Sequence, residues 1–165
     1  MNIVTYAPRH LDAVLTLCKA EGWISFAGNP ERAGRAMTAP GVTALVAVED
    51  KTDADRPGPI GPGASGAGEE RVLGFAQAVG DGCFGGYLCM LLVDEEARGR
   101  GIGKALVERT MVESGVLRLD LLSSDRAMSL YERFPHNRIP GFRLYPDESL
   151  RPPEASPPGT QSAGD

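Results

Sequence analysis

A short segment of alternating glycine and basic residues has the composition of an anion-binding loop. It reads RGRGIGK over residues 98–104 and follows an acidic turn that ends an apolar run over residues 87–93. A helical pattern continues directly from the loop, so the free N–H groups of the first helical turn and three cations come together. Glycine lets the backbone approach a phosphate closely and adopts a positive φ without strain. The segment therefore predicts the binding of a phosphate or diphosphate group.

Two common phosphate loops are excluded by their spacing. A P-loop requires glycine five residues before its Gly-Lys pair and Ser or Thr after it, and the chain has Arg98 and Ala105 at these positions. A dinucleotide fingerprint that starts at Gly99 requires glycine where Lys104 lies. The loop matches a third pattern, Arg-x-x-Gly-x-Gly, from Arg98 onward. Alone, this hexamer would also fit a basic surface turn; the strand before it and the helix after it favour ligand binding.

With these flanks, the pattern resembles the acetyl-CoA loop of the GCN5-related N-acetyltransferases, the GNAT family. In that family the loop amides hold the CoA diphosphate, and the preceding strand pairs with the pantetheine arm through its backbone. The resemblance implies acetyl-CoA as the cosubstrate and no metal. The residues that it implies for CoA binding are Leu92, Val93, Arg98, Gly99, Arg100, Gly101, Ile102, Gly103, Lys104 and Ser124.

One tyrosine is the candidate catalytic residue. Residues 127–132, AMSLYE, resemble the second GNAT motif, N-x-x-A-x-x-L-Y-E, whose tyrosine hydroxyl protonates the leaving CoA thiolate. A phenol has a pKa of about 10, so Tyr131 would hold its proton at neutral pH. Helical spacing also allows the ring to pack in the core, and both roles are compatible. The chain departs from the motif at Ser124, where asparagine is usual, and at an insertion over residues 135–140 before Gly141.

The sequence does not identify a general base. The apolar run over residues 87–93 contains no carboxylate, and a base that acts through ordered water would leave no sequence signature. A backbone amide near Leu92 is expected to meet the developing oxyanion. The carboxylates that come into question as a base are Glu21, Asp81, Asp94, Glu95 and Glu96.

Apolar periodicity predicts the elements that must position this loop. Strands are predicted over residues 3–6, 43–49, 71–79, 84–93, 116–122 and 142–145, with a hairpin joining the third and fourth. Helices are predicted over residues 9–20, 30–37 and 102–114, and a last one is capped by Ser123 to Asp125 and ends near Phe134. The order is β-α-α-β-β-β-α-β-α-β. This α/β arrangement, a central twisted mixed β-sheet flanked by helices (α+β mixed sheet), is also the GNAT fold that the resemblance implies.

Length and composition limit the organisation of the chain. Its 165 residues predict a single domain over residues 1–150, followed by a disordered tail over residues 151–165. The Pro- and Gly-rich residues 51–70 are expected to form a flexible loop between two strands, with a substrate lid as the alternative. Three cysteines fit no zinc pattern, so no metal site is expected.

The predicted function is an N-acetyltransferase that transfers acetyl directly from acetyl-CoA to a primary amine of a small molecule or peptide. The alternative is a catalytically inactive acyl-CoA-binding module with a regulatory or structural role. A net charge of −5 argues against nucleic acid as a partner. No apolar run reaches membrane-spanning length and no signal peptide is evident, so neither a membrane nor an export signal is expected and the predicted location is cytoplasmic. A homodimer is common in such folds, but no residue specifies an interface.

Overall fold

The computed structural model describes residues 1–50, 70–147 and 149. The chain forms two compact units, Met1–Phe134 and Pro135–Asp165. The described strands and α-helices all lie in the first unit. The sequence predictions for residues 51–69 and for the tail over residues 151–165 lie outside the described residues. The prediction of one domain over residues 1–150 stays a prediction.

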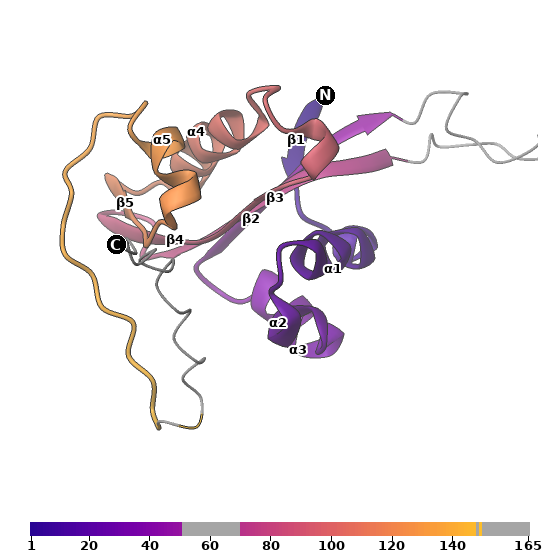
Figure 1. The fold of residues 1–165 in the computed structure, drawn as a ribbon, viewed down its shortest axis with the longest axis horizontal. Helices are drawn as coiled ribbons and strands as arrows, with labels where there is room; N and C mark the ends of the chain where they lie inside the picture. The colour runs from indigo at the N-terminus through magenta and orange to yellow at the C-terminus, as the bar shows by residue number, and fades with distance from the viewer. Residues whose placement is uncertain (51–69, 148, 150–165) are drawn as a thin grey trace, which may run out of the picture. The chain divides into compact units, whose positions relative to one another are not determined.

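The first unit is built on a five-stranded sheet (Figure 1). The strands are β1 (Asn2–Thr5), β2 (Val42–Asp50), β3 (Glu70–Gly80), β4 (Gly85–Val93) and β5 (Arg118–Asp120). They lie side by side in chain order. The first four pair antiparallel, and β5 pairs parallel to β4. A parallel neighbour requires a crossover, and a helix between β4 and β5 provides it.

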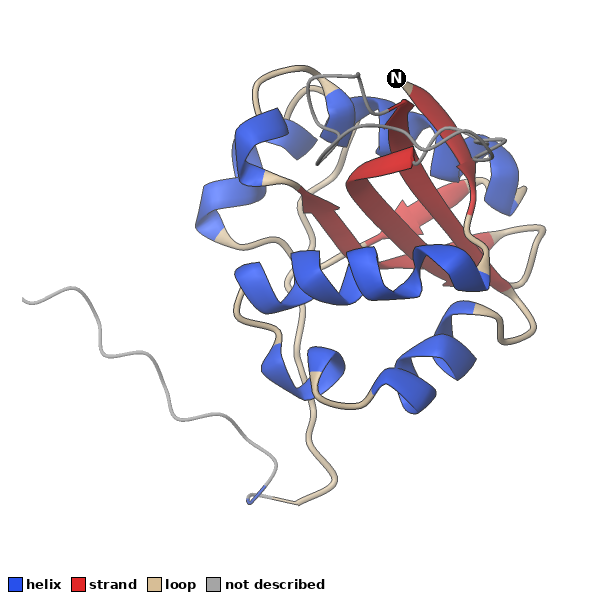
Figure 2. Ribbon diagram, turned by 90° about the vertical axis from the view of Figure 1, so that its right-hand side faces the viewer, coloured by secondary structure: helices blue, strands red, loops and turns tan. Residues whose placement is uncertain are grey.

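Helices cover both faces of this sheet, as Figures 1 and 2 show. On one face lie α1 (Leu11–Ala20), α2 (Ile24–Ala27) and α3 (Pro30–Met37), and on the other lie α4 (Ile102–Ser114) and α5 (Met128–Tyr131). Local signals set several helix ends. Asn29 accepts a hydrogen bond from Arg32 N at 3.1 Å at the start of α3. Gly115, with φ of +66°, ends α4 in the left-handed conformation that commonly terminates a helix.

The core forms on both faces because side chains alternate along the strands. In β2, Val46 and Val48 point to the face that carries α1, whereas Leu45 and Ala47 point to the face that carries α4. Phe75 on β3 is fully buried in the first of these layers. The pattern of α4 likewise places Ile102 and Leu106 against the sheet.

Replacing Phe75 by alanine should destabilise the fold strongly. The side chain is 0% exposed, so its loss leaves a cavity as well as lost burial. We expect the free energy of unfolding to fall by about 3–5 kcal/mol, measured by chemical denaturation. Phe84 is 66% exposed, so Phe84→Ala is the matched control and should change stability by no more than about 0.5 kcal/mol. Equal losses in the two variants would contradict this description of the core.

The predicted fold class is confirmed: the structure has a mixed sheet with helices on both faces. The predicted hairpin is confirmed as β3 and β4, which pair from Gly74↔Val93 to Gly80↔Gly86. The predicted bounds of α3 and α4 agree with the structure. These elements have strong local signals, namely proline at a helix start, helical periodicity and glycine at a helix end.

Four local predictions were wrong. The strand predicted over residues 142–145 does not form: residues 141–147 contain neither strand nor helix. The strand predicted over residues 116–122 is shorter in the structure: it is β5, whose three residues pair with β4. The last helix comprises a 3-10 turn, Asp125–Ala127, and α5. The short helix α2 forms where neither a helix nor a strand was predicted. Strand propensity without a paired neighbour is a weak signal, which explains the first two errors.

Among the described residues, no helix has both the length and the apolar character needed to cross a membrane.

Candidate acetyl-CoA site

The site begins where β4 and β5 diverge. The two strands pair only at Gly85↔Arg118, Gly86↔Leu119 and Tyr87↔Asp120. From Leu88 to Val93, β4 pairs with β3 on one side, and no described strand pairs with it on the other. The free edge offers backbone N–H and C=O groups to an extended ligand. Because the Leu92 side chain packs in the core, this part of β4 presents its backbone rather than its side chains to the edge.

A β-bulge lies on the same stretch of β4. Met90 pairs with Gln77 and Leu88 pairs with Ala78, so Cys89 is an extra residue without a partner in the ladder. A bulge leaves the extra residue's backbone unpaired and changes the direction of the strand. The bulge therefore lies at the beginning of the free edge, where the strands separate.

The glycine-rich loop connects the end of β4 to α4. Asp94 starts it by accepting a hydrogen bond from Glu96 N at 2.9 Å, which caps the 3-10 turn Glu95–Ala97. Gly99 and Gly101 then adopt φ values of +78° and +81°. A Cβ atom at either glycine would have no heavy atom within 4 Å. The predicted need for glycine is confirmed at these two positions, and it arises from backbone conformation in open space rather than from crowding.

A third glycine has a different role. Gly103 lies in the first turn of α4, and a Cβ atom there would lie 3.3 Å from Cδ2 of Leu130, just before Tyr131. The absence of a side chain thus allows the start of α4 to pass close to α5. One glycine-rich motif therefore contains two physical requirements, positive φ before the helix and close packing within it.

Substituting Gly101 tests the first requirement. Gly101→Ala should lower the free energy of unfolding by on the order of 1–2 kcal/mol, because the left-handed conformation at this position is unfavourable for alanine. The matched control is Gly34→Ala in α3, where the new Cβ would lie 3.6 Å from Leu11 Cδ2, an ordinary contact. The free energy of unfolding of that variant should rise by about 0.5–1 kcal/mol, because alanine has a higher helix propensity than glycine. Thermal denaturation should show a lower melting temperature for Gly101→Ala and a higher one for Gly34→Ala. A Gly101→Ala variant as stable as the unaltered protein would contradict the assigned backbone conformation.

The three loop cations all have carboxylate partners. Arg98 pairs with Glu21, and Arg100 pairs with Glu49 at 2.6 Å. Lys104 pairs with Glu108 one turn along α4, and its Nζ lies 5.7 Å from the ring centroid of Phe134. The hydrogen bond from Arg100 lowers the pKa of the Glu49 carboxyl group. The loop charge is therefore balanced locally, and an incoming anion would have to compete with these carboxylates.

The candidate acid, Tyr131, lies at the end of α5 and beside the start of the free edge. Its half-buried ring packs against a small cluster formed by Ala78, Leu88 and Val107. The predicted packing role is thus confirmed. Burial raises the pKa of the Tyr131 phenol above its ordinary value of 10.0. The hydroxyl consequently holds its proton at neutral pH, as a general acid must.

Ser124 begins the 3-10 turn before α5, but its side chain makes no capping hydrogen bond. The hydroxyl of Ser123 instead donates to the Ser124 carbonyl oxygen at 2.8 Å. The prediction that this serine segment caps a helix through its side chains was therefore wrong, because the turn that follows is held by Ala127 N donating to the Ser124 carbonyl oxygen at 3.0 Å. The role of Ser124 in CoA binding stays a prediction.

Several candidate bases have structural partners. Asp81 accepts hydrogen bonds from Cys83 N and Phe84 N at 2.8 and 2.7 Å, and these bonds lower its pKa. Asp94 and Glu96 both accept from Arg71, at 3.3 and 2.7 Å. These carboxylates therefore stabilise turns and pair with an arginine.

Glu21 differs because it reaches the loop itself. Its two carboxylate oxygens accept from Arg98 and from Arg126. Arg126 was not among the predicted site residues. No sequence signal could have found it, because its partner is 105 positions away in the chain.

Comparison with known proteins agrees with this geometry. Residues 65–134 match the family described as "Acetyltransferase (GNAT) domain". The chain is similar to the chloroplastic serotonin N-acetyltransferase 2 of Oryza sativa subsp. japonica, with 32% identity over 80 residues. The aligned region is 47% of this chain and 37% of the rice protein, so the chain spans less than two fifths of that relative.

Two solved structures share the fold. One is an aminoglycoside 6'-N-acetyltransferase complexed with coenzyme A, with a TM-score of 0.54 and 21% identity, covering 73% of this chain and 61% of that one. The other is a predicted acetyltransferase of Clostridium acetobutylicum with acetyl-CoA, with a TM-score of 0.62 and 11% identity, covering 87% of this chain and 94% of that one. Residues 65–134 thus match the GNAT acetyltransferase family, and the chain shares the fold of these two acetyltransferase structures.

Proposed function

We propose that the chain is an N-acetyltransferase that transfers the acetyl group of acetyl-CoA directly to a primary amine of a small molecule or peptide. The observation that carries this proposal is the free edge of β4, from Leu88 to Val93, which runs directly into the glycine-rich loop. An extended thioester with a diphosphate at one end requires a strand edge for its amides and an anion site at the end of that strand.

The chain's own groups fit this ligand. The left-handed glycines leave open space above the loop, so backbone N–H groups can approach a diphosphate. Arg98, Arg100 and Lys104 supply cations, and guanidinium groups bind phosphate through paired hydrogen bonds. The backbone of Leu92 and Val93 would pair with the pantetheine arm, as a strand pairs with an added neighbour. Ile102 would contribute its N–H group, since it is the first residue of α4.

The transfer would break one bond and form another. The acceptor ammonium first loses a proton to solvent. The neutral amine nitrogen then attacks the thioester carbon and a C–N bond forms, and the second proton that the nitrogen loses passes through solvent to restore the Tyr131 phenol. The C–S bond breaks with its electron pair remaining on sulfur. Tyr131 gives its phenolic proton to that thiolate, and backbone N–H groups along the free edge stabilise the oxyanion. Burial keeps the Tyr131 phenol protonated at neutral pH, which the acid role requires.

The acceptor class is supported by the names of similar proteins. The rice relative is named for serotonin and a structural neighbour for aminoglycosides, and both acceptors carry amino groups. For this chain we propose an amine acceptor without specifying the molecule.

Calorimetry followed by an amine panel tests the proposal. The protein should bind acetyl-CoA with a Kd on the order of micromolar, and at least one primary amine should then release free CoA thiol. Binding without thiol release across the panel would favour the inactive acyl-CoA-binding module. No binding of acetyl-CoA would contradict both functions, because both require the loop to hold the diphosphate.

A further inference from the structure

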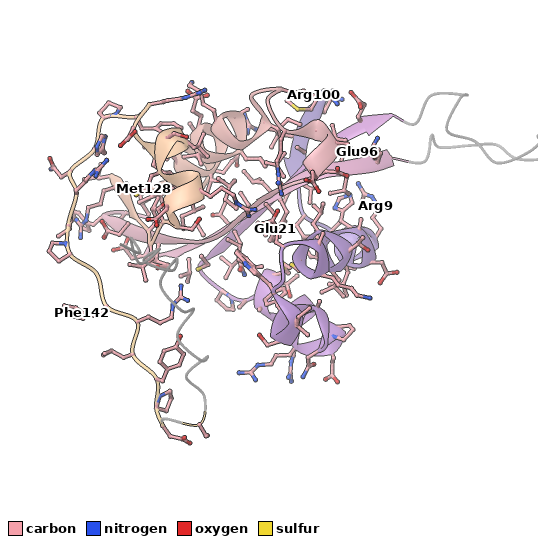
Figure 3. All side chains as sticks on the ribbon, in the orientation of Figure 1. Arg9, Glu21, Glu96, Arg100, Met128 and Phe142 are labelled. Carbon is pink, nitrogen blue, oxygen red and sulfur yellow. The ribbon has the colours of Figure 1, made fainter. Side chains whose placement is uncertain are left out.

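One carboxylate joins the two segments that follow the diverging strands. Glu21 lies directly after α1, and Figure 3 shows it between that helix and the sheet. Arg98 follows β4 and Arg126 follows β5, and both donate to Glu21, one to each carboxylate oxygen. The Glu21 side chain is only 14% exposed. A single, largely buried carboxylate therefore holds an arginine from each side of the opening.

Local structure does not favour an acidic residue at this position. The C-terminal end of a helix carries a partial negative charge, which repels a carboxylate. The stabilisation of Glu21 must therefore come from the two arginines. Arg98 is held further by a hydrogen bond of 3.3 Å from its Nε to the carbonyl oxygen of Val93, the last residue of the free edge. The pairing thus orients Arg98 at the point where the strand enters the loop.

Guanidinium groups bind carboxylate and phosphate with the same geometry. Glu21 consequently takes on Arg98 and Arg126 the position that a phosphate oxygen would take. A diphosphate that binds the loop competes with Glu21 for these two donors. Once the diphosphate has displaced it from the arginines, Glu21 is a largely buried carboxylate without a partner. This state is unfavourable unless a cation replaces the arginines.

The acceptor supplies such a cation. A primary amine has a pKa of about 10.4 and reaches the protein as an ammonium ion. We propose that Glu21 is an acceptor-binding residue that becomes available only when acetyl-CoA is bound. The diphosphate takes Arg98 and Arg126 from it, and the freed carboxylate receives the acceptor ammonium. This inference rests on the proposed function and adds a residue and a binding order to it.

The proposal predicts opposite changes in the Kd for acetyl-CoA when Glu21 and when its partner Arg126 are replaced. Glu21→Gln removes the competing charge, so its Kd for acetyl-CoA should fall by about fivefold, whereas Arg126→Gln removes a donor and its Kd should rise by about fivefold. The Arg126 side chain is 72% exposed, so that variant should fold. Glu21→Asp withdraws the carboxylate from the arginines and should also bind more tightly, which provides a second variant if Glu21→Gln does not fold. Glu113→Gln on α4, whose partner is Arg109, is the matched control for the loss of one negative charge.

Kinetics supply the second measurement. With an amine from the panel, Glu21→Gln should raise the KM for the amine by roughly tenfold while lowering the KM for acetyl-CoA. A purely structural ion pair would weaken acetyl-CoA binding in both Glu21→Gln and Arg126→Gln, and that result would overturn the inference while leaving the proposed function intact. An unchanged KM for the amine would overturn it as well. If the unaltered protein binds no acetyl-CoA, the inference and the proposed function fail together.

Discussion

Replacing Arg98 and Lys104 by alanine together should lower the affinity for acetyl-CoA by about 100-fold or more, because each charge-assisted hydrogen bond to a phosphate is worth on the order of 1.5–3 kcal/mol. Arg98 lies in the loop before α4 and Lys104 lies in the first turn of that helix, where the free N–H groups also attract an anion. Calorimetric titration at fixed ionic strength measures the change. The loss should be smaller at high salt, because salt already screens part of this attraction in the unaltered protein.

The matched control removes the same residue types elsewhere. Lys19 lies in the last turn of α1, and Arg109 on α4 pairs with Glu113 at 2.6 Å, away from the loop. The double variant Lys19→Ala, Arg109→Ala changes the net charge equally and should keep its affinity within about twofold. Equal losses in both double variants would show that only overall charge matters. An unchanged Kd in the loop variant would remove the main support for the CoA site.

Replacing Tyr131 by phenylalanine should lower kcat by about 100-fold or more, since general acid catalysis contributes that much. The ring should still pack against Leu88 and Val107, so the Kd for acetyl-CoA should change by no more than about twofold. Steady-state kinetics and calorimetry on the same preparation separate the two effects. Tyr6→Phe is the matched control, because burial also raises the pKa of Tyr6, a tyrosine at the other end of the sheet.

The pH profile provides an independent readout of the same residue. Burial raises the pKa of Tyr131 above 10.0, so the acid form should persist throughout the neutral range, and kcat should fall only as the pH rises through that higher value. Tyr131→Phe should lose this alkaline limb. The raised pKa of Tyr131 also affects the free energy of unfolding, because it favours the folded state with a protonated phenol. This stabilisation is complete below a pH of about 10 and is lost as the pH rises above it. An unchanged kcat in Tyr131→Phe would leave Tyr131 with a packing role alone.

The loop and its helix could be predicted from the sequence because their signals are local. Gly101 and Gly115 have the positive φ values that only glycine adopts easily, and between them α4 keeps its predicted bounds. Tyr131 was found through a short motif, which fixes its place in the chain. Its burial and raised pKa were not in the motif, because they depend on Leu88 and Val107 from other elements.

The lengths of β5 and α5 could not be predicted, because a strand or helix end depends on what it packs against. Apolar residues 116–122 suggested a longer strand, yet β5 stops at Asp120, where its pairing with β4 ends. At residues 142–145 alternating apolar residues suggested a strand, and there Phe142 and Leu144 remain 85% and 88% exposed. Apolar alternation by itself does not form a strand, because a strand also requires pairing with a neighbouring strand.

The sequence by itself determined the glycine-rich loop, the helix that follows it and the tyrosine motif, since each is encoded within a few neighbouring residues. Only the tertiary structure decided what faces the loop. It opened the edge of β4 by letting β5 diverge after Tyr87, and it brought Glu21 to Arg98 and Arg126 across 77 and 105 positions of chain. Contacts of this kind depend on strand register and helix packing, which no local pattern of residue types specifies.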